Sequence, residues 1–357
     1  MKRQKIYLII ACLLAVLSVL AIVYKQGGFR RSLNTQKLSA VFAIKDTGTI
    51  TRVFLADMYG RKTLLSKEAT GWMVNNSKPA SEMKVKEMIA TLTSIRVAQP
   101  IAKAGHRNII ERMAVTSTKV EVYETKPLFT LFGYPFFTKE RLIKTYFFGD
   151  ATQNSLGSYA LVEGMAEPYI IYKPGFRGYV TPEFSPNPFD WYSHLIFNTK
   201  LTRIQKASFV DIENPENSFF VEKAGPRTFN LFDVHNNPLM DYDTTRLINM
   251  LSEFRSRYYE IFYADMSKSL KDSIIQFNFF KMISITDVED KTTALKLYYQ
   301  IDSGSLYENE ELIEEEYHQL NKDRCYATFN DNTDEIYSIQ FLHFDRQIQP
   351  LSYYLKK

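Results

Sequence analysis

Two stretches of this 357-residue chain read as copies of each other, and this repeat constrains the possible folds more than any other feature. The segment KPASEMKVKEMIATLTSI begins at Lys78, and the segment NPLMDYDTTRLINMLSEF begins at Asn237. Placing Pro79 on Pro238 aligns them without a gap and matches apolar residues that recur every three or four positions. This spacing is typical of an amphipathic helix. We therefore predict equivalent helices at residues 82–96 and 242–258.

Strand-like segments surround each predicted helix. One pair precedes each helix, at 41–45 with 51–56 and at 207–212 with 218–223. Four more follow in each copy, at 119–124, 142–148, 158–163 and 169–173, and at 274–280, 294–300, 324–329 and 336–344. Many alternate apolar and polar residues, which favours antiparallel sheets with one solvated face. The sequence thus predicts an α+β fold of two repeated units, 40–200 and 201–357, each with antiparallel strands and one amphipathic helix.

An almost unbroken apolar run covers residues 6–24. Nineteen helical residues span roughly 28 Å, which matches a bilayer core. We predict a transmembrane anchor there, with residues 1–5 as a cytoplasmic tail and 25–39 as a linker. Two alternatives remain open: a signal peptide cleaved after Val19-Leu20-Ala21, and a lipoprotein modified at Cys12. Both place the cleavage or modification site inside the apolar run.

Charge is distributed unevenly along the chain. The first 39 residues carry seven of the 44 basic residues and none of the 40 acidic ones, so residues 40–357 hold 37 basic and 40 acidic residues. A folded region with this slight acidic excess does not suit binding to nucleic acid. Basic residues flank the apolar run on both sides, but a five-residue tail is too short to form a domain. We expect a single-pass protein of the cell inner membrane with its soluble region on the periplasmic side.

Several of these segments together resemble a known group of proteins. They are the anchor, the strand pair, the strand Trp72-Met73-Val74-Asn75, the turn Lys78-Pro79-Ala80 and the segment around Trp191. The resemblance is to an uncharacterised bacterial family, a domain of unknown function whose members are envelope proteins with a duplicated α+β body. Some members resemble companions of gliding-type ABC transport systems. The resemblance supplies no catalytic residue and no activity.

Catalytic signatures are absent from the sequence. It contains no phosphate-binding P-loop, no G-x-S-x-G elbow and no H-E-x-x-H helix. The five histidines lie far apart, and Cys325 is the only cysteine outside the apolar run, which favours a buried, unreactive thiol. We predict no catalytic, cofactor-binding or metal-ligating residue. The acidic residues of 241–243 are interpreted as helix caps, and the acidic run 308–316 as a solvated helix.

One apolar segment stands where a polar turn is usual. Residues 128–137 read LFTLFGYPFF between two predicted strands, and Lys126, Lys139, Arg141 and Lys144 flank them. Either the segment folds back onto the core, or its tip is exposed and docks on a membrane or a partner. A second aromatic site follows a proline-rich approach and either plugs the core or stacks a ligand. The candidate interaction residues are Phe129, Phe132, Tyr134, Phe136, Phe137, Trp191 and Tyr192.

Three classes of function remain open from the sequence. The leading hypothesis is a non-enzymatic accessory or binding subunit of a membrane complex, with a protein partner. The second is an enzyme whose site lies at the interface of the two repeats. The third is a glycan- or peptide-binding module. No cofactor is indicated, and the sequence leaves the question of a small-molecule ligand open.

The predicted orientation has a direct test. Alkaline phosphatase fused to the C-terminus is expected to be active, because the soluble region lies outside the cytoplasm, and the protein is expected to sediment with membranes. An inactive fusion would reverse the orientation, and a soluble product lacking residues 1–21 would contradict the anchor.

Overall fold

The computed structural model describes residues 28–131, 134–308 and 311–356. The chain divides into two compact units, one ending at Ser193 and one beginning at His194, which we call unit 1 and unit 2. In the three described ranges, no helix combines the length and apolar character needed to cross a bilayer. The predicted span at 6–24 lies outside the described residues.

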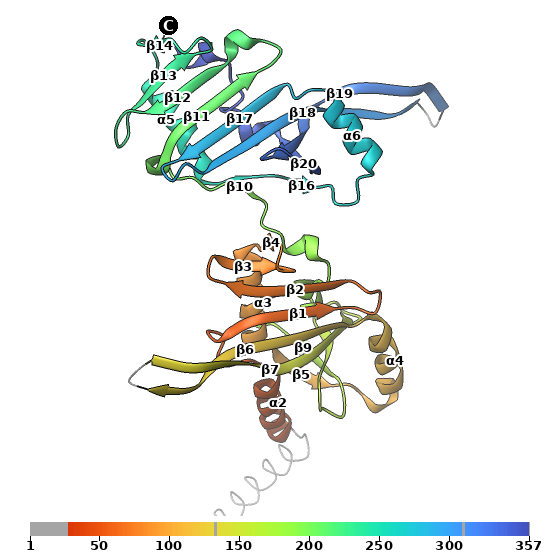
Figure 1. Ribbon diagram of the computed structural model, residues 1–357. Coiled ribbons are helices and arrows are strands. Elements are labelled where there is room, and N and C mark those ends of the chain that lie inside the picture. Colours follow the sequence, from red (N-terminus) through yellow and green to blue (C-terminus); the bar gives the residue numbers. More distant parts are fainter. Residues whose placement is uncertain (1–27, 132–133, 309–310, 357) are drawn as a thin grey trace, which may run out of the picture. The chain divides into compact units, whose positions relative to one another are not determined.

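Unit 1 is built on one antiparallel sheet (Figure 1), whose strand order in the described residues is β4-β3-β2-β1-β6-β7-β8-β9-β5. It consists of two meanders, β1 to β4 and β6 to β9, joined through β1 and β6, with β5 at the far edge. The strands are β1 (Ile50–Ala56), β2 (Lys62–Glu68), β3 (Gly71–Val74), β4 (Lys78–Pro79), β5 (Arg96–Pro100), β6 (Thr118–Leu131), β7 (Tyr134–Ala151), β8 (Ser158–Val162) and β9 (Tyr169–Tyr172).

Unit 2 repeats this topology. Its large sheet, as far as it is described, has the order β14-β13-β12-β11-β17-β18-β19-β20-β16, which pairs β1 with β11, β6 with β17 and β9 with β20 position by position. A register shift near the start of β1 against β6 also recurs at the start of β11 against β17. The strands are β11 (Ile204–Asp211), β12 (Phe219–Lys223), β13 (Phe229–Asp233), β14 (Pro238–Leu239), β16 (Ile261–Phe262), β17 (Lys281–Asp287), β18 (Thr292–Glu308), β19 (Glu311–Phe329) and β20 (Asn332–Gln340). A separate pair is formed by β10 (Leu195–Phe197) and β15 (Arg257–Tyr258).

Two helices recur at equivalent places in the described part of each unit, so the expectation of one helix per unit was too low. They are α3 (Glu82–Ser94) and α4 (His106–Thr116) in unit 1, and α5 (Thr244–Ser252) and α6 (Lys268–Gln276) in unit 2. The predicted strand at 274–280 was wrong, because α6 covers its first residues and only Ile274 of that helix is buried. Helix α5 is also shorter than predicted.

Helix α2 (Gly28–Phe42) replaces the predicted strand at 41–45 and covers most of the expected linker. Its last carbonyl groups find donors on β7: the Lys144 ammonium donates to Ala43 O at 3.1 Å and to Val41 O, and the Tyr146 hydroxyl donates to Phe42 O at 2.5 Å. These donors satisfy helix-end carbonyls that would otherwise lack partners. The apolar alternation of this segment resembles a strand, but the β7 contacts and the full burial of Phe42 favour a helix end.

A return segment closes each unit. After the last meander strand, residues 181–192 in unit 1 and 341–355 in unit 2 run back to the start of α3 or α5. The backbone N–H of the N-cap residue then donates to the carbonyl of a buried aromatic: Ser81 to Trp191 and Asp243 to Tyr354, each at 2.7 Å. Trp191 is 3% exposed and Tyr354 is fully buried. The aromatic side chain therefore fills the core while its backbone fixes the helix start.

A basic side chain on the first turn of the helix strengthens this closure in both units. Lys84 donates to Asp190 O at 2.6 Å, and Arg246 donates to Tyr353 O at 2.8 Å. Each accepting carbonyl belongs to the residue just before the buried aromatic. The two units thus share a hydrogen-bonding arrangement as well as a strand order.

These contacts correct the sequence alignment of the repeat. Because Ser81 and Asp243 are the N-caps, Met88 corresponds to Met250, and Leu92 corresponds to Phe254, three residues away from the match made on Pro79 and Pro238. Of the two acidic residues predicted as caps, Asp241 lies before the helix and Asp243 is the N-cap, whose carboxylate accepts from two backbone N–H groups. A shift of three residues is close to one helical turn, so both alignments superpose the apolar faces.

The closure generates a stability prediction. Trp191→Ala and Tyr354→Ala are each expected to lower the free energy of unfolding by roughly 3–5 kcal/mol, since each removes a large buried aromatic and leaves a cavity. Phe277→Ala is the control, because its aromatic side chain is 77% exposed and lies outside the return segments. Denaturant unfolding followed by circular dichroism measures the three variants. Losses below about 1 kcal/mol at both buried positions would contradict the closure.

Candidate functional site

A two-stranded arm projects from the sheet of unit 1 (Figure 1). Strand β6 pairs with β1 as far as Glu124, and Thr125 N still donates to Thr49 O at 3.0 Å. Beyond Thr125, β6 and β7 pair with each other as far as Leu131 opposite Tyr134. We call residues 125–140 the unit-1 arm. It contains the apolar segment 128–137 at its tip. An isolated two-stranded hairpin is marginally stable in water. The arm has no further strand beside it to stabilise it.

The shared topology does not require this arm. In unit 2 the equivalent strands β17 and β18 are joined by a turn of four residues, 288–291, closed by a hydrogen bond from Asp287 N to Lys291 O. Unit 2 instead extends its next hairpin, β18 with β19, from residue 300 to residue 320. The shared sheet therefore forms whether the first or the second hairpin of this meander is the short one.

The extended β18–β19 hairpin of unit 2 corrects the expectation for the acidic run. The acidic run 308–316 was predicted to be a solvated helix, but β18 ends at Glu308 and β19 begins at Glu311. Glu308 lies opposite Glu311 in the ladder, and Tyr307 lies opposite Leu312. The described residues of the run, 308 and 311–316, therefore lie in the two strands of a β-hairpin. The sequence suggested a helix because a run of charged residues is typical of a solvated helix. The structure has a strand because β18 pairs with this part of β19.

The tip of the unit-1 arm exposes aromatic rings. Phe129 is 50% exposed and Phe137 is 73% exposed, and their ring centroids lie 6.0 Å apart. Phe137 has a φ of +49°, a conformation that is costly for a bulky residue. The exposed ring gains little burial in return within the described chain. Of the other predicted residues, Phe132 and the side chains of Tyr134 and Phe136 lie outside the description.

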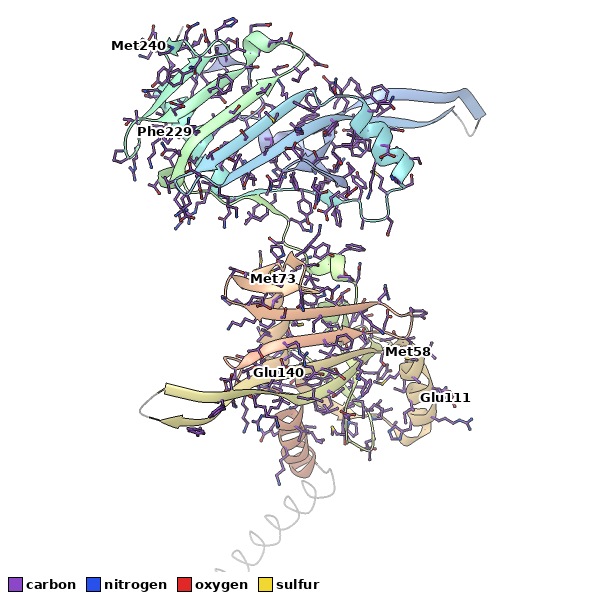
Figure 2. All side chains as sticks on the ribbon, viewed as in Figure 1. Met58, Met73, Glu111, Glu140, Phe229 and Met240 are labelled. Atoms are coloured by element: carbon purple, nitrogen blue, oxygen red, sulfur yellow. The ribbon has the colours of Figure 1, made fainter. Side chains whose placement is uncertain are left out.

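Charged side chains fix the root of the arm. Glu124 is 3% exposed and accepts from Arg141 at 2.5 Å, Lys126 at 2.8 Å and the Thr49 hydroxyl at 2.9 Å. Burial alone would raise the pKa of Glu124, but these hydrogen bonds outweigh it and lower the pKa from 4.5 to about 2. Across the sheet, Arg52 on β1 pairs with Glu140 on β7 at 2.6 Å; Figure 2 labels Glu140 near this root.

This network changes the interpretation of the basic flank. Lys126 and Arg141 are engaged by Glu124, and Lys144 donates to the end of α2. Of the four basic residues, only Lys139 makes no hydrogen bond or ion pair with the described residues. The arm therefore presents exposed aromatic rings beyond a basic root, where Lys126 and Arg141 share the single carboxylate of Glu124.

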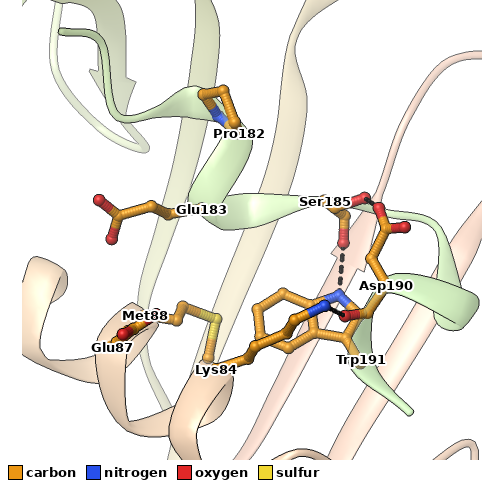
Figure 3. Close-up of a pocket in the computed structure, with 8 residues that line it drawn as sticks. All are labelled: Lys84, Glu87, Met88, Pro182, Glu183, Ser185, Asp190 and Trp191. Carbon is orange, nitrogen blue, oxygen red and sulfur yellow. Dashed lines mark hydrogen bonds between the residues drawn. The ribbon is translucent and has the colours of Figure 1, made fainter. Parts of the chain in front are cut away.

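The second predicted site lies at the return segment of unit 1. Trp191 faces a cavity of about 340 Å³ between α3 and residues 182–191 (Figure 3). Its indole N–H donates to Ser185 O at 2.8 Å, so the ring is held by its own segment. Tyr192 is half-buried, and its neighbour in the backbone bridge is Ala80. The other lining residues are Lys84, Glu87, Met88, Pro182, Glu183 and Asp190.

The sequence analysis had singled out only Trp191 of this cavity. Lys84 and Glu87 lie on α3, about a hundred residues before Glu183 and Asp190, so sequence spacing carries no sign that they meet. The exposed positions of α3 read as an ordinary solvated face. Only the return of the chain to the start of the helix brings the two sets together.

Neither metal chemistry nor known relatives identify a reaction. In the ranges that the structure describes, no group of three or more His, Cys, Asp or Glu side chains is arranged to hold a metal ion. Cys325 is fully buried, and burial raises the pKa of its thiol. Comparison of the chain with protein-family models, curated proteins and solved structures finds no match.

The root of the arm predicts a pH dependence. Because the pKa of Glu124 is lowered by folding, its charge stabilises the native state above pH 4.5, and this contribution is lost as the pH falls from about 4.5 towards 2. Denaturant unfolding of the parent protein and of Glu124→Gln, measured across that range, is expected to show a stability difference that shrinks on acidification. A constant difference would show that Glu124 titrates normally.

Proposed function

We propose that the protein is a membrane-anchored envelope protein that acts as a non-enzymatic accessory or binding subunit of a membrane complex, with the unit-1 arm as its docking element. The observation that carries the proposal is the arm tip, where Phe129 and Phe137 stay exposed on a hairpin that the fold does not need. Exposed apolar groups of this kind mark interaction sites. The anchor is the apolar run 6–24.

A protein partner suits the tip better than an anionic membrane surface. Binding to anionic headgroups relies on basic residues at the docking surface. The charged groups of Lys126, Arg141 and Lys144 are instead directed to Glu124 and to the end of α2, at the root of the arm. Helix α2 adds a second argument: its 15 residues, which rise about 22 Å, lie in the chain between the predicted span and the sheet. Exposed aromatic rings are typical anchors at the centre of a protein interface.

The association with an ABC-type transport system is part of the same proposal. It rests on the resemblance of the chain to envelope proteins, some of which resemble companions of such systems. An arm that reaches beyond its own sheet would dock on a neighbouring subunit. A glycan-stacking role for Trp191 has less support, because that ring is 3% exposed and hydrogen-bonded within its own segment.

Charging the tip separates docking from folding. Phe137→Glu is expected to change the free energy of unfolding by no more than about 0.5 kcal/mol, because the ring is exposed, and to abolish co-purification of the partner with the tagged protein from native membranes. Phe277→Glu is the matched control, since Phe277 is 77% exposed in unit 2 and lies far along the chain from the arm. It should keep the partner.

A shortened arm extends the test. Replacing residues 127–138 by Asn-Gly retains Lys126 and Lys139 at the root and supplies a favoured two-residue turn. This variant should fold and lose the partner. A large fall in stability would mean that the arm supports the fold, and retained co-purification in both arm variants would contradict the docking role.

A further inference from the structure

The cavity beside Trp191 has a chemical character that the closure of unit 1 does not require. Its wall combines Trp191 and Met88 with one ammonium group, Lys84, and three carboxylates. In Figure 3, Glu87 and Glu183 lie on one side of the view, with Trp191 and Lys84 on the other. An apolar wall with an excess of acid groups suits a cation carried on an apolar stem.

Internal contacts leave part of this acidity uncompensated. Glu183 is paired with Lys173 at 3.1 Å and accepts from the Thr91 hydroxyl. Lys84 directs its ammonium to the Asp190 carbonyl, not to a carboxylate. Glu87 makes no hydrogen bond or ion pair with any residue that the structure describes. Its carboxylate is therefore available to a ligand at the mouth of the cavity.

Asp190 adds a second carboxylate without a basic partner in its contacts. Its oxygens accept from the Ser185 hydroxyl at 2.5 Å and from the Asn187 amide at 3.3 Å, both neutral donors. These contacts orient the group and leave its charge in place. The cavity is thus bordered by oriented negative charge beside an aromatic ring.

In unit 2, the equivalent contact between the helix and the return segment uses different charged groups. Counting from the N-caps, Thr91 of α3 corresponds to Glu253 of unit 2. Glu253 is held there by Arg346 at 2.6 Å and by Gln347 at 2.9 Å, and Gln347 is 2% exposed. The return segment of unit 2 thus supplies its own cationic side chain to the helix. In unit 1 the return segment supplies acids.

We propose that the cavity of unit 1 binds a guanidinium or ammonium group on a short apolar stem, with the stem against Pro182 and the aliphatic part of Lys84 and the cation at Glu87. The volume of about 340 Å³ fits one such side chain or a small diamine. Two sources share this chemistry: a basic side chain of a protein partner and a free organic amine. The site is distinct from the unit-1 arm.

The test uses the full-length protein in detergent and two probes at constant ionic strength: agmatine, and the peptide acetyl-Gly-Arg-Gly-amide. The chain has two tryptophans, so the Trp191 indole N–H signal is assigned by NMR with the Trp72→Phe variant. We expect a saturable shift of the Trp191 signal. Tighter binding of the peptide would identify a protein side chain as the source, and tighter binding of agmatine a free amine.

Charge reversal supplies the specificity control. Glu87→Lys is expected to weaken binding at least about tenfold, because it places a cation where the ligand cation binds. Glu111→Lys reverses a similarly exposed carboxylate on α4, outside the cavity, and should leave binding unchanged (Figure 2). Thermal unfolding checks that both variants fold. No saturable shift with either probe, or equal weakening by both variants, would overturn the proposal.

Discussion

The return segment is the constraint on which each unit depends. The two meanders of the sheet do not by themselves hold the start of the helix that follows them. One hydrogen bond does so, from the backbone N–H of the N-cap residue to the carbonyl of a buried aromatic residue. Trp191 performs this role in unit 1 and Tyr354 in unit 2, each next to a carbonyl that accepts from Lys84 or Arg246. Because the aromatic fills the core while its backbone caps the helix, packing and hydrogen bonding cannot be lost separately.

Once the shared fold is fixed, the differences between the units become informative. Each unit lengthens a different hairpin, β6 with β7 in one and β18 with β19 in the other, while its counterpart keeps that turn short. Each return segment also places different charges against its helix. Neither difference is needed to close the sheet. The unit-1 arm and the cavity beside Trp191 are therefore the parts of unit 1 that its fold leaves unexplained.

The sequence predicted the repeat, the α+β class and most strands, because apolar periodicity is local and survives in both copies. It placed a strand at 41–45 and at 274–280, where tertiary contacts favour helix ends, and a helix at 308–316, where β18 supplies a strand partner. The alignment slipped by three residues because that shift keeps the same helical face inward. The cavity was out of reach, since Glu87 and Glu183 meet only through the return of the chain.

The most direct test of the account is site-specific photocrosslinking in native membranes. A photoreactive phenylalanine analogue is placed at Phe137 on the unit-1 arm or at Phe277 in unit 2, two positions of similar exposure. The account predicts that the probe at 137 forms a discrete crosslinked species with another protein of the membrane and that the probe at 277 does not. Crosslinks from 137 to lipid alone, or equal crosslinking from both positions, would contradict the arm as a docking element.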